Sequence, residues 1–257
     1  MSQGAAPAEP EKSTSTRAEA SPPAGRVLVR NPPGWVRQVL LVAGKDLSIE
    51  LATGEIITTS GFFAVLVAII GSLSFYSGAD AKQSVAPGVI WVAVAFASIL
   101  ALSRTWSRER EDGALAGLLV MPLARSAIFA GKALGVAAFV TAVELIVVPV
   151  SALLFAVDLV QVGPGLVLLA LSATPGIAAS GTLFGAMTVR TRARDLVLAS
   201  VLFPLLAPTL LAAVAGTREL FGGAPIGELV DYMQLMGVFG VVFTAGGLGL
   251  FELLIES

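Results

Sequence analysis

The residues of this chain that could take part in chemistry are concentrated in one short segment. Residues 107–132 read SREREDGALAGLLVMPLARSAIFAGK. Only 13% of the 257 residues are charged and 56% are hydrophobic, yet this segment opens with five charges of both signs in succession: Arg108, Glu109, Arg110, Glu111 and Asp112. Such side chains make ion pairs, and they can form the polar rim around apolar anchors where one protein contacts another.

Composition excludes several kinds of reaction centre. The chain has no cysteine, which excludes disulfides, CxxC redox pairs, thiolate metal sites and haem attachment through CxxCH. It has no histidine, the usual metal ligand, general base and haem ligand. The Gly-Lys pairs at Lys45 and Lys132 lack the upstream glycine and the following Ser or Thr of an ATP-binding P-loop. We therefore expect no catalytic residue, metal site or bound cofactor, and the net charge of −2 gives no reason to expect nucleic acid.

One acidic residue lies within an apolar stretch. Glu144 interrupts residues 133–157, which are otherwise uncharged. An intramembrane carboxyl group is a candidate functional site because a polar group is costly in lipid. It could carry a proton, line a polar path or make a structural hydrogen bond to a neighbouring helix. The structural bond is slightly favoured, because the sequence shows no cationic partner for it.

The elements that must position these residues are membrane helices. The mean hydropathy of +0.87 and the low charge are far from those of a soluble domain. Only helices satisfy their backbone in lipid at these lengths, so we expect an all-α integral membrane domain over 35–257, after a disordered, polar tail at 1–34. Six stretches can cross about 30 Å of lipid at about 1.5 Å per residue: residues 56–79, 83–103, 133–157, 159–189, 196–217 and 232–251.

A further helix is expected before the first span, over residues 35–55. Apolar residues recur there at helical spacing, which favours a position in the membrane interface over packing on other protein: Val36, Leu40, Ala43, Leu47 and Leu51.

The basic residues predict the topology, because cytoplasmic loops carry the excess of Lys and Arg. With both termini in the cytoplasm, the outer connections carry only Lys82 and Arg218. The inner ones carry most of the rest: Arg104, Arg108, Arg110, Arg125, Lys132, Arg190, Arg192 and Arg194. The outer connection at 218–231 fits either a short helix or a shallow re-entrant turn.

A short helix is predicted in the loop that follows the charged run. Leu115, Leu118 and Leu119 fall on one face of residues 114–121, after Gly113, and Pro122 ends the helix. The acidic residues precede it, where a helix N-terminus favours negative charge. Such an element fits a groove on a partner protein. The alternative is a solvated loop that sets topology.

The loop also carries a resemblance. The run EREDGALAGLLVMPLARSAIFAGK at 109–132 resembles the cytoplasmic coupling loop of ABC-2 type exporter permeases. Within that group the chain is similar to the cytochrome c maturation protein B family (CcmB, haem exporter protein B). Four further stretches carry this similarity, which extends from about residue 35 to the end: GKDLSIEL (44–51), APGVIWVAVAFASILALSRTW (86–106), TPGIAASGTLFGAMTVRTRARD (174–195) and LFPLLAPTLLAA (202–213).

The resemblance implies an ABC-2 type exporter permease in the bacterial inner membrane. It implies an interfacial elbow helix and a coupling helix at 114–119, seated in a separate ABC ATP-binding subunit that hydrolyses ATP. The residues implied in coupling are those of the loop: Glu109, Arg110, Glu111, Asp112, Gly113, Leu115, Leu118, Leu119 and Pro122.

The resemblance also implies a cargo and further partners. Haem would be the cargo, and a haem-handling membrane protein and a haem chaperone would be partners in c-type cytochrome biogenesis. Since this chain has no histidine, it would offer haem only an apolar wall with aromatics such as Trp91. Two other functions stay open: an ABC-2 permease for a lipid, glycan or drug, and a non-transporting scaffold of a haem-handling complex.

Glycines indicate where helices approach closely. Gly181 and Gly185 form a GxxxG pair in the fourth span, and the sixth span is also rich in glycine. One six-span chain is half of a permease, so we expect a homodimer or a second membrane subunit, in contact with membrane lipids. These glycine faces are candidates for the contact.

Overall fold

The computed structural model describes residues 33–74, 79–111, 117, 120–188 and 194–256. Residues 1–32, which make up most of the predicted tail, lie outside the described part of the chain. Pro32–Ser257 forms one compact unit, and the fold below is that of this unit.

The described residues form helices and no strand. Six of the helices are long and apolar enough to cross a membrane, and α1 precedes them, which confirms the all-α membrane fold. The elements are α1 (Trp35–Thr53), α2 (Glu55–Ser74), α3 (Ala79–Glu111), α5 (Arg125–Phe155), α6 (Leu159–Thr188), α7 (Arg194–Phe221), the 3₁₀ turn η1 (Ile226–Leu229) and α8 (Val230–Glu256).

Several helix ends differ from those expected. α3 continues to Glu111, about two turns beyond the predicted end at residue 103, and α5 begins at Arg125, about two turns before residue 133. Hydropathy marks the part of a helix that lies in lipid, whereas charged turns outside lipid continue the same helix. The connection after α7 contains the single turn η1, so the short helix is the correct alternative there.

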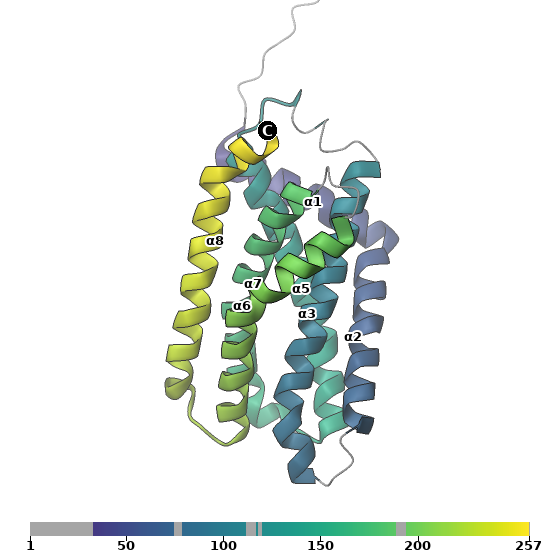
Figure 1. Cartoon of the computed structure of the whole chain (residues 1–257), viewed down its shortest axis with the longest axis vertical. Helices are drawn as coiled ribbons and strands as arrows, with labels where there is room; N and C mark the ends of the chain where they lie inside the picture. The colour runs from purple at the N-terminus through teal and green to yellow at the C-terminus, as the bar shows by residue number, and fades with distance from the viewer. Residues whose placement is uncertain (1–32, 75–78, 112–116, 118–119, 189–193, 257) are drawn as a thin grey trace, which may run out of the picture. The chain divides into compact units, whose positions relative to one another are not determined.

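The helices that matter for the charged loop meet at one end of the bundle. α1 lies across this end, at the top of Figure 1, and packs mainly against α5. α5 in turn contacts α2, α3, α6 and α8. α3 enters the loop and α5 leaves it, so the loop joins two central helices beside α1.

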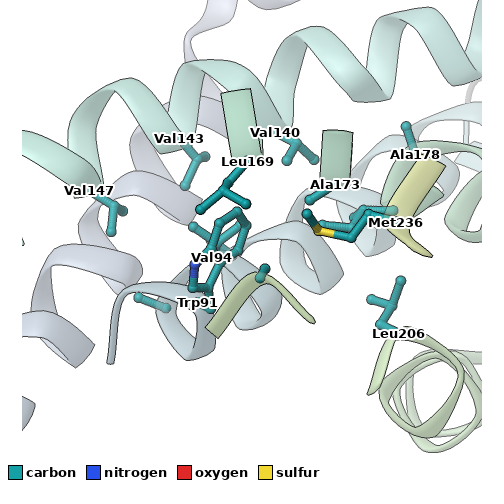
Figure 2. Packing of buried hydrophobic residues seen from close by; sticks show 14 of the residues in the cluster. Trp91, Val94, Val140, Val143, Val147, Leu169, Ala173, Ala178, Leu206 and Met236 are labelled. Atoms are coloured by element: carbon teal, nitrogen blue, oxygen red, sulfur yellow. The ribbon is translucent and has the colours of Figure 1, made fainter. Parts of the chain in front are cut away.

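More than half of the residues in the main core cluster are Ala, Val or Ile, and Leu and Trp make up most of the rest. Figure 2 shows Trp91 and Val94 of α3 close to Val143 of α5 and Leu169 of α6, all of them buried. Side chains of this size let the helices approach closely. Much of the outer surface is apolar as well, as expected where lipid is the solvent: Phe62, Leu73, Leu145, Leu153, Leu211 and Val241 are all exposed.

The predicted GxxxG pair packs inside the chain. A side chain at Gly181 would collide with Leu102 of α3, and one at Gly185 would collide with the Trp106 indole. The pair therefore allows α6 to approach α3, which confirms a close helix contact. Because α3 already covers this face, it is not available for contact with a second subunit.

Candidate coupling site

α1 buries three polar residues against the bundle, together with the apolar residues Val39, Val42 and Ala43. Gln38, Asp46 and Glu50 are buried, and their spacing in multiples of four places them on one face. Most of the predicted apolar stripe lies on the other side: Val36, Leu40 and Leu51 are exposed, and only Ala43 of the stripe is fully buried. α1 thus packs on protein through a face of mixed polarity and exposes several apolar side chains, while its position in the membrane interface stays a prediction.

Four charged side chains meet where α1 packs against α3 and α5, and two of them belong to α1 itself. The Lys132 ammonium of α5 donates to both carboxylate oxygens of Asp46, at 3.0 and 2.8 Å, and to Glu109 of α3. Lys45 donates to the same Glu109 oxygen at 2.6 Å and lies 3.3 Å from Asp46. We refer to these residues, Lys45, Asp46, Glu109 and Lys132, as the charge cluster.

The charge cluster is buried and electrically balanced. Lys132 is 1% exposed, Glu109 4% and Asp46 7%, and two positive charges face two negative ones. Ions taken out of water are costly unless they are paired, so removing one partner of such a pair typically costs about 3–5 kcal/mol. The three helices are therefore held in one relative position at this point.

The half-buried member, Lys45, is held in its charged form. Burial alone would lower its pKa. The hydrogen bond to Glu109 and the charges of Asp46 and Glu109 outweigh burial and raise the pKa of Lys45 above its ordinary value of 10.5. Lys45 therefore stays charged throughout the physiological range.

A second layer of ion pairs holds the corner between α1 and α2. Arg108 of α3 lies 3.7 Å from Glu50 and 3.2 Å from Glu55, and Arg104 lies 3.4 Å from Glu55. Glu50 also accepts a hydrogen bond of 2.8 Å from the backbone N–H of Ile57, in the first turn of α2. These contacts tie the last turns of α3 to both helices that precede it.

The other end of the loop is tied to α1 by uncharged contacts. The Gln38 amide oxygen accepts a hydrogen bond of 2.8 Å from the backbone N–H of Ala124, the residue before α5. The Trp35 indole donates to Ser126 at 3.1 Å. Gly131 lets α5 approach α1 closely, because a Cβ atom at this position would lie only 2.6 Å from the Cβ atom of Val42. Both ends of residues 112–124 are thus fastened to α1.

A small cavity adjoins the charge cluster. It has a volume of about 120 Å³ and is lined in part by Lys45, Asp46, Arg108 and Glu109. The second carboxylate oxygen of Glu109 is buried without a hydrogen-bond partner within the described structure. A cavity of this size, lined by charged and apolar side chains, has room for a water molecule beside Glu109.

The structure places only some of the predicted coupling residues. Glu109 lies in the charge cluster, and Pro122 is exposed in the turn before α5. Arg110 and Glu111 end α3, and nothing further is described of their side chains. The remaining predicted residues, Asp112, Gly113, Leu115, Leu118 and Leu119, lie outside the described residues. Gly117 and Val120 have helical backbone, but most of the short helix predicted over 114–121 lies outside the described residues and stays a prediction.

The other two candidate residues lie away from this site. Trp91 is 3% exposed in the core, and its indole donates a 2.9 Å hydrogen bond to Thr217 of α7. Contact between Trp91 and haem would require the helices to separate, so that role stays a prediction. Glu144 is buried between α5 and α6, within hydrogen-bond distance of Thr174.

Sequence reasoning missed three of the four members of the charge cluster. Lys45 and Lys132 enter the sequence-based interpretation only in excluding a P-loop and, for Lys132, in assigning topology, and Asp46 is not singled out there. A signal is present, since Asp46 and Glu50 lie one turn apart in a helix that also carries a stripe of apolar residues. Acidic residues on the inner side of such a helix need basic partners, and Lys132 is one.

Comparison with known proteins agrees with this architecture. Residues 37–245 match the family described as CcmB protein. The chain is similar to heme exporter protein B of Paracoccus denitrificans, with 34% identity over 150 residues that cover 57% of this chain and 67% of the relative. It is 26% identical over 181 residues to the protein of that name from Bradyrhizobium diazoefficiens (70% and 80% covered), and 29% identical over 195 residues to that from Haemophilus influenzae (72% and 85% covered).

Proposed function

The chain belongs to the CcmB protein family, and on that premise we propose that it is the membrane-spanning permease subunit of an ATP-driven haem exporter. The relatives that carry the name heme exporter protein B support haem as the cargo. The output would be haem for c-type cytochromes. The protein would lie in the bacterial inner membrane, with an ABC ATP-binding subunit, a haem-handling membrane protein and a haem chaperone as partners.

The observation that carries the proposal is the charge cluster at the two ends of the loop. Glu109 precedes residues 112–124 and Lys132 follows them, and both bind α1 through Asp46 or Lys45. A partner that moves this loop would move the ends of α3 and α5 together with α1. Such a unit suits the transfer of motion from an ATP-binding subunit into the membrane helices.

The chain needs a partner for the chemical step. It has no P-loop, so ATP would be hydrolysed on the other subunit. The side of the membrane is proposed from charge, because Lys45, Arg108 and Lys132 gather at the end of the bundle where α1 lies. The positive-inside rule assigns that end to the cytoplasm, where ATP is available.

Haem would meet apolar surface here rather than a ligand. The chain has neither histidine nor cysteine, and Met and Tyr are its remaining residue types that commonly ligate haem, so we expect a partner protein to supply the axial ligand. The residues of this chain would transmit motion, exclude water and offer apolar helix faces. A second membrane subunit, either another copy of the chain or a different permease, would complete the path.

A deletion strain tests the cargo and a loop variant tests the coupling. Deletion of the gene is expected to abolish covalently haem-bearing c-type cytochromes, and the wild-type gene should restore them. Leu118→Asp with Leu119→Asp is expected to insert in the membrane normally but to restore no cytochrome and to lose co-purification with the ATPase. Arg104→Gln, a change in an exposed ion pair, serves as the control that should restore function.

The alternatives give different results. Intact cytochromes in the deletion strain would exclude haem as the cargo and point to a permease for a lipid, glycan or drug. Full cytochrome production by the double aspartate variant would contradict coupling and favour a non-transporting scaffold. Purification of the wild-type protein in mild detergent then distinguishes a scaffold from a permease, because a scaffold would co-purify with the haem-handling protein but not with an ATPase.

A further inference from the structure

A second cavity lies between α5 and α6, far from the charge cluster. It has a volume of about 290 Å³, and Glu144 and Thr141 are the polar side chains among residues that are otherwise apolar. Glu144 is twelve residues beyond Lys132 on α5, which is about 18 Å along the helix. Glu144 therefore lies well inside the membrane-spanning part of the bundle, and the cavity extends from there to Leu159, the first residue of α6, away from the proposed coupling site.

The cavity opens toward lipid. Three of the residues that line it, Leu145, Val167 and Leu171, are 71%, 57% and 61% exposed. They belong to two neighbouring spans, and their exposed surface has no aqueous neighbour at this depth. A molecule dissolved in the bilayer could reach the cavity from the side without crossing the protein.

The described residues do not satisfy all the hydrogen-bonding capacity of the Glu144 carboxyl group. The Thr174 hydroxyl is 3.1 Å from each Glu144 oxygen, but it is also 2.8 Å from the carbonyl oxygen of Ala170. A hydroxyl has one proton to donate, so it satisfies one of these three acceptors. None of the described residues that line the cavity is basic. At least one oxygen of the Glu144 carboxyl group is thus left to accept a further hydrogen bond, although the residue is only 6% exposed.

A proline frees a backbone carbonyl group near the cavity. Pro149 lies within α5 and lines the cavity. It has no N–H, so the carbonyl group of Leu145, four residues earlier, loses its usual helical partner. The cavity itself combines a carboxyl group, which offers an acceptor oxygen, with apolar walls.

We propose that this cavity binds a single-chain, lipid-soluble molecule with a hydroxyl head that donates a hydrogen bond to Glu144. A charged head would be costly at this depth, whereas a hydroxyl needs only an acceptor. The volume is at the lower limit of ligand sites, which typically measure about 300–1,000 Å³, so a chain fits better than a macrocycle. The proposal does not depend on haem being the cargo.

Photolabelling tests the proposal with two matched probes. The purified full-length protein in lipid vesicles is exposed to a long-chain alcohol that carries a diazirine, and in parallel to its methyl ether, which cannot donate a hydrogen bond. Peptide mass spectrometry locates the adducts. We expect the alcohol to label residues 141–149 and 163–171 about five- to tenfold more than the ether, because one neutral hydrogen bond separates the probes.

Variants tie the label to the carboxyl group. Glu144→Leu is expected to reduce labelling by the alcohol to the level of the ether. Glu144→Gln keeps an acceptor oxygen and should retain the labelling, so it controls for loss of label through misfolding. Ser172→Ala removes another membrane-facing hydroxyl of α6 and should change nothing. Equal labelling by both probes, full labelling of the leucine variant, or no adduct in either segment would overturn the proposal.

Discussion

Replacing Lys132 with methionine would leave two buried carboxylates, Asp46 and Glu109, with Lys45 as their nearest cation. Methionine matches the length and shape of the lysine stem, so the change removes charge with little loss of packing. Lys132 is 1% exposed and bonds both carboxylates, so we expect the full cost of breaking a buried pair, about 3–5 kcal/mol of unfolding free energy. This single change tests whether the charge cluster holds α1 to the bundle.

A second change should recover part of that loss. Asp46→Asn removes one carboxylate and is destabilising alone, because it leaves Lys132 with less negative charge. In the double variant, Lys45 and Glu109 remain as a balanced pair at 2.6 Å. We therefore expect the two costs to be non-additive, with a coupling energy of about 2 kcal/mol in favour of the double variant.

Equilibrium unfolding in mixed micelles, with SDS as the denaturant, measures all four members of this cycle. Arg104→Met serves as the control, since the Arg104–Glu55 pair is about half exposed and should cost less than about 1 kcal/mol. Strict additivity of the two changes, or a cost for Lys132→Met no larger than that of the control, would refute the structural role of the charge cluster.

Three further outcomes follow from single contacts. Gly185→Ala should destabilise the protein by about 1–3 kcal/mol because its methyl group collides with an indole of α3, whereas Gly237→Ala, which meets open space, should stay within about 0.5 kcal/mol; thermal unfolding compares them. Trp91→Phe removes a hydrogen bond to Thr217 and should cost about 1 kcal/mol with cytochrome production retained; a folded variant that makes no cytochrome would instead place this ring on the haem path. Because the pKa of Lys45 is raised above 10.5, its stabilising contribution is fully present below pH 10.5 and is lost as the pH rises through the higher folded value, so Lys45→Met should flatten the alkaline decline seen in a pH series of unfolding midpoints.

The number and kind of the helices could be predicted because lipid imposes them. An apolar stretch of sufficient length must be a helix in a membrane, whatever packs against it. The same logic failed at residues 104–111 and 125–132, where charged turns extend α3 and α5 beyond the lipid. Composition changes there, but the backbone does not, and these turns are held by contacts with α1, α2 and α6 that periodicity does not show.

The charge cluster could not be predicted in the same way, because its members are far apart in sequence. Asp46 and Lys132 are 86 positions apart, and periodicity within one helix does not say which residue of another helix faces it. Glu109 was singled out as part of a charged loop, yet it is buried at the end of a helix. Sequence located the charged segment, and tertiary packing decides which of its charges are available to a partner.

The contacts of α3 explain how the charge cluster could transmit motion from the loop to the other helices. Glu109 is bound to α1 and α5, while Trp106, one turn earlier on the same part of α3, packs against Gly185 of α6. A helix end held at two successive turns by three other helices cannot bend freely when the adjoining loop moves. The displacement must then pass to α1, α5 and α6 together, because both the ion pairs and the glycine contact resist sliding. An apolar contact at Glu109 would hold α3 with less directional constraint, which is a physical reason for charges in this place.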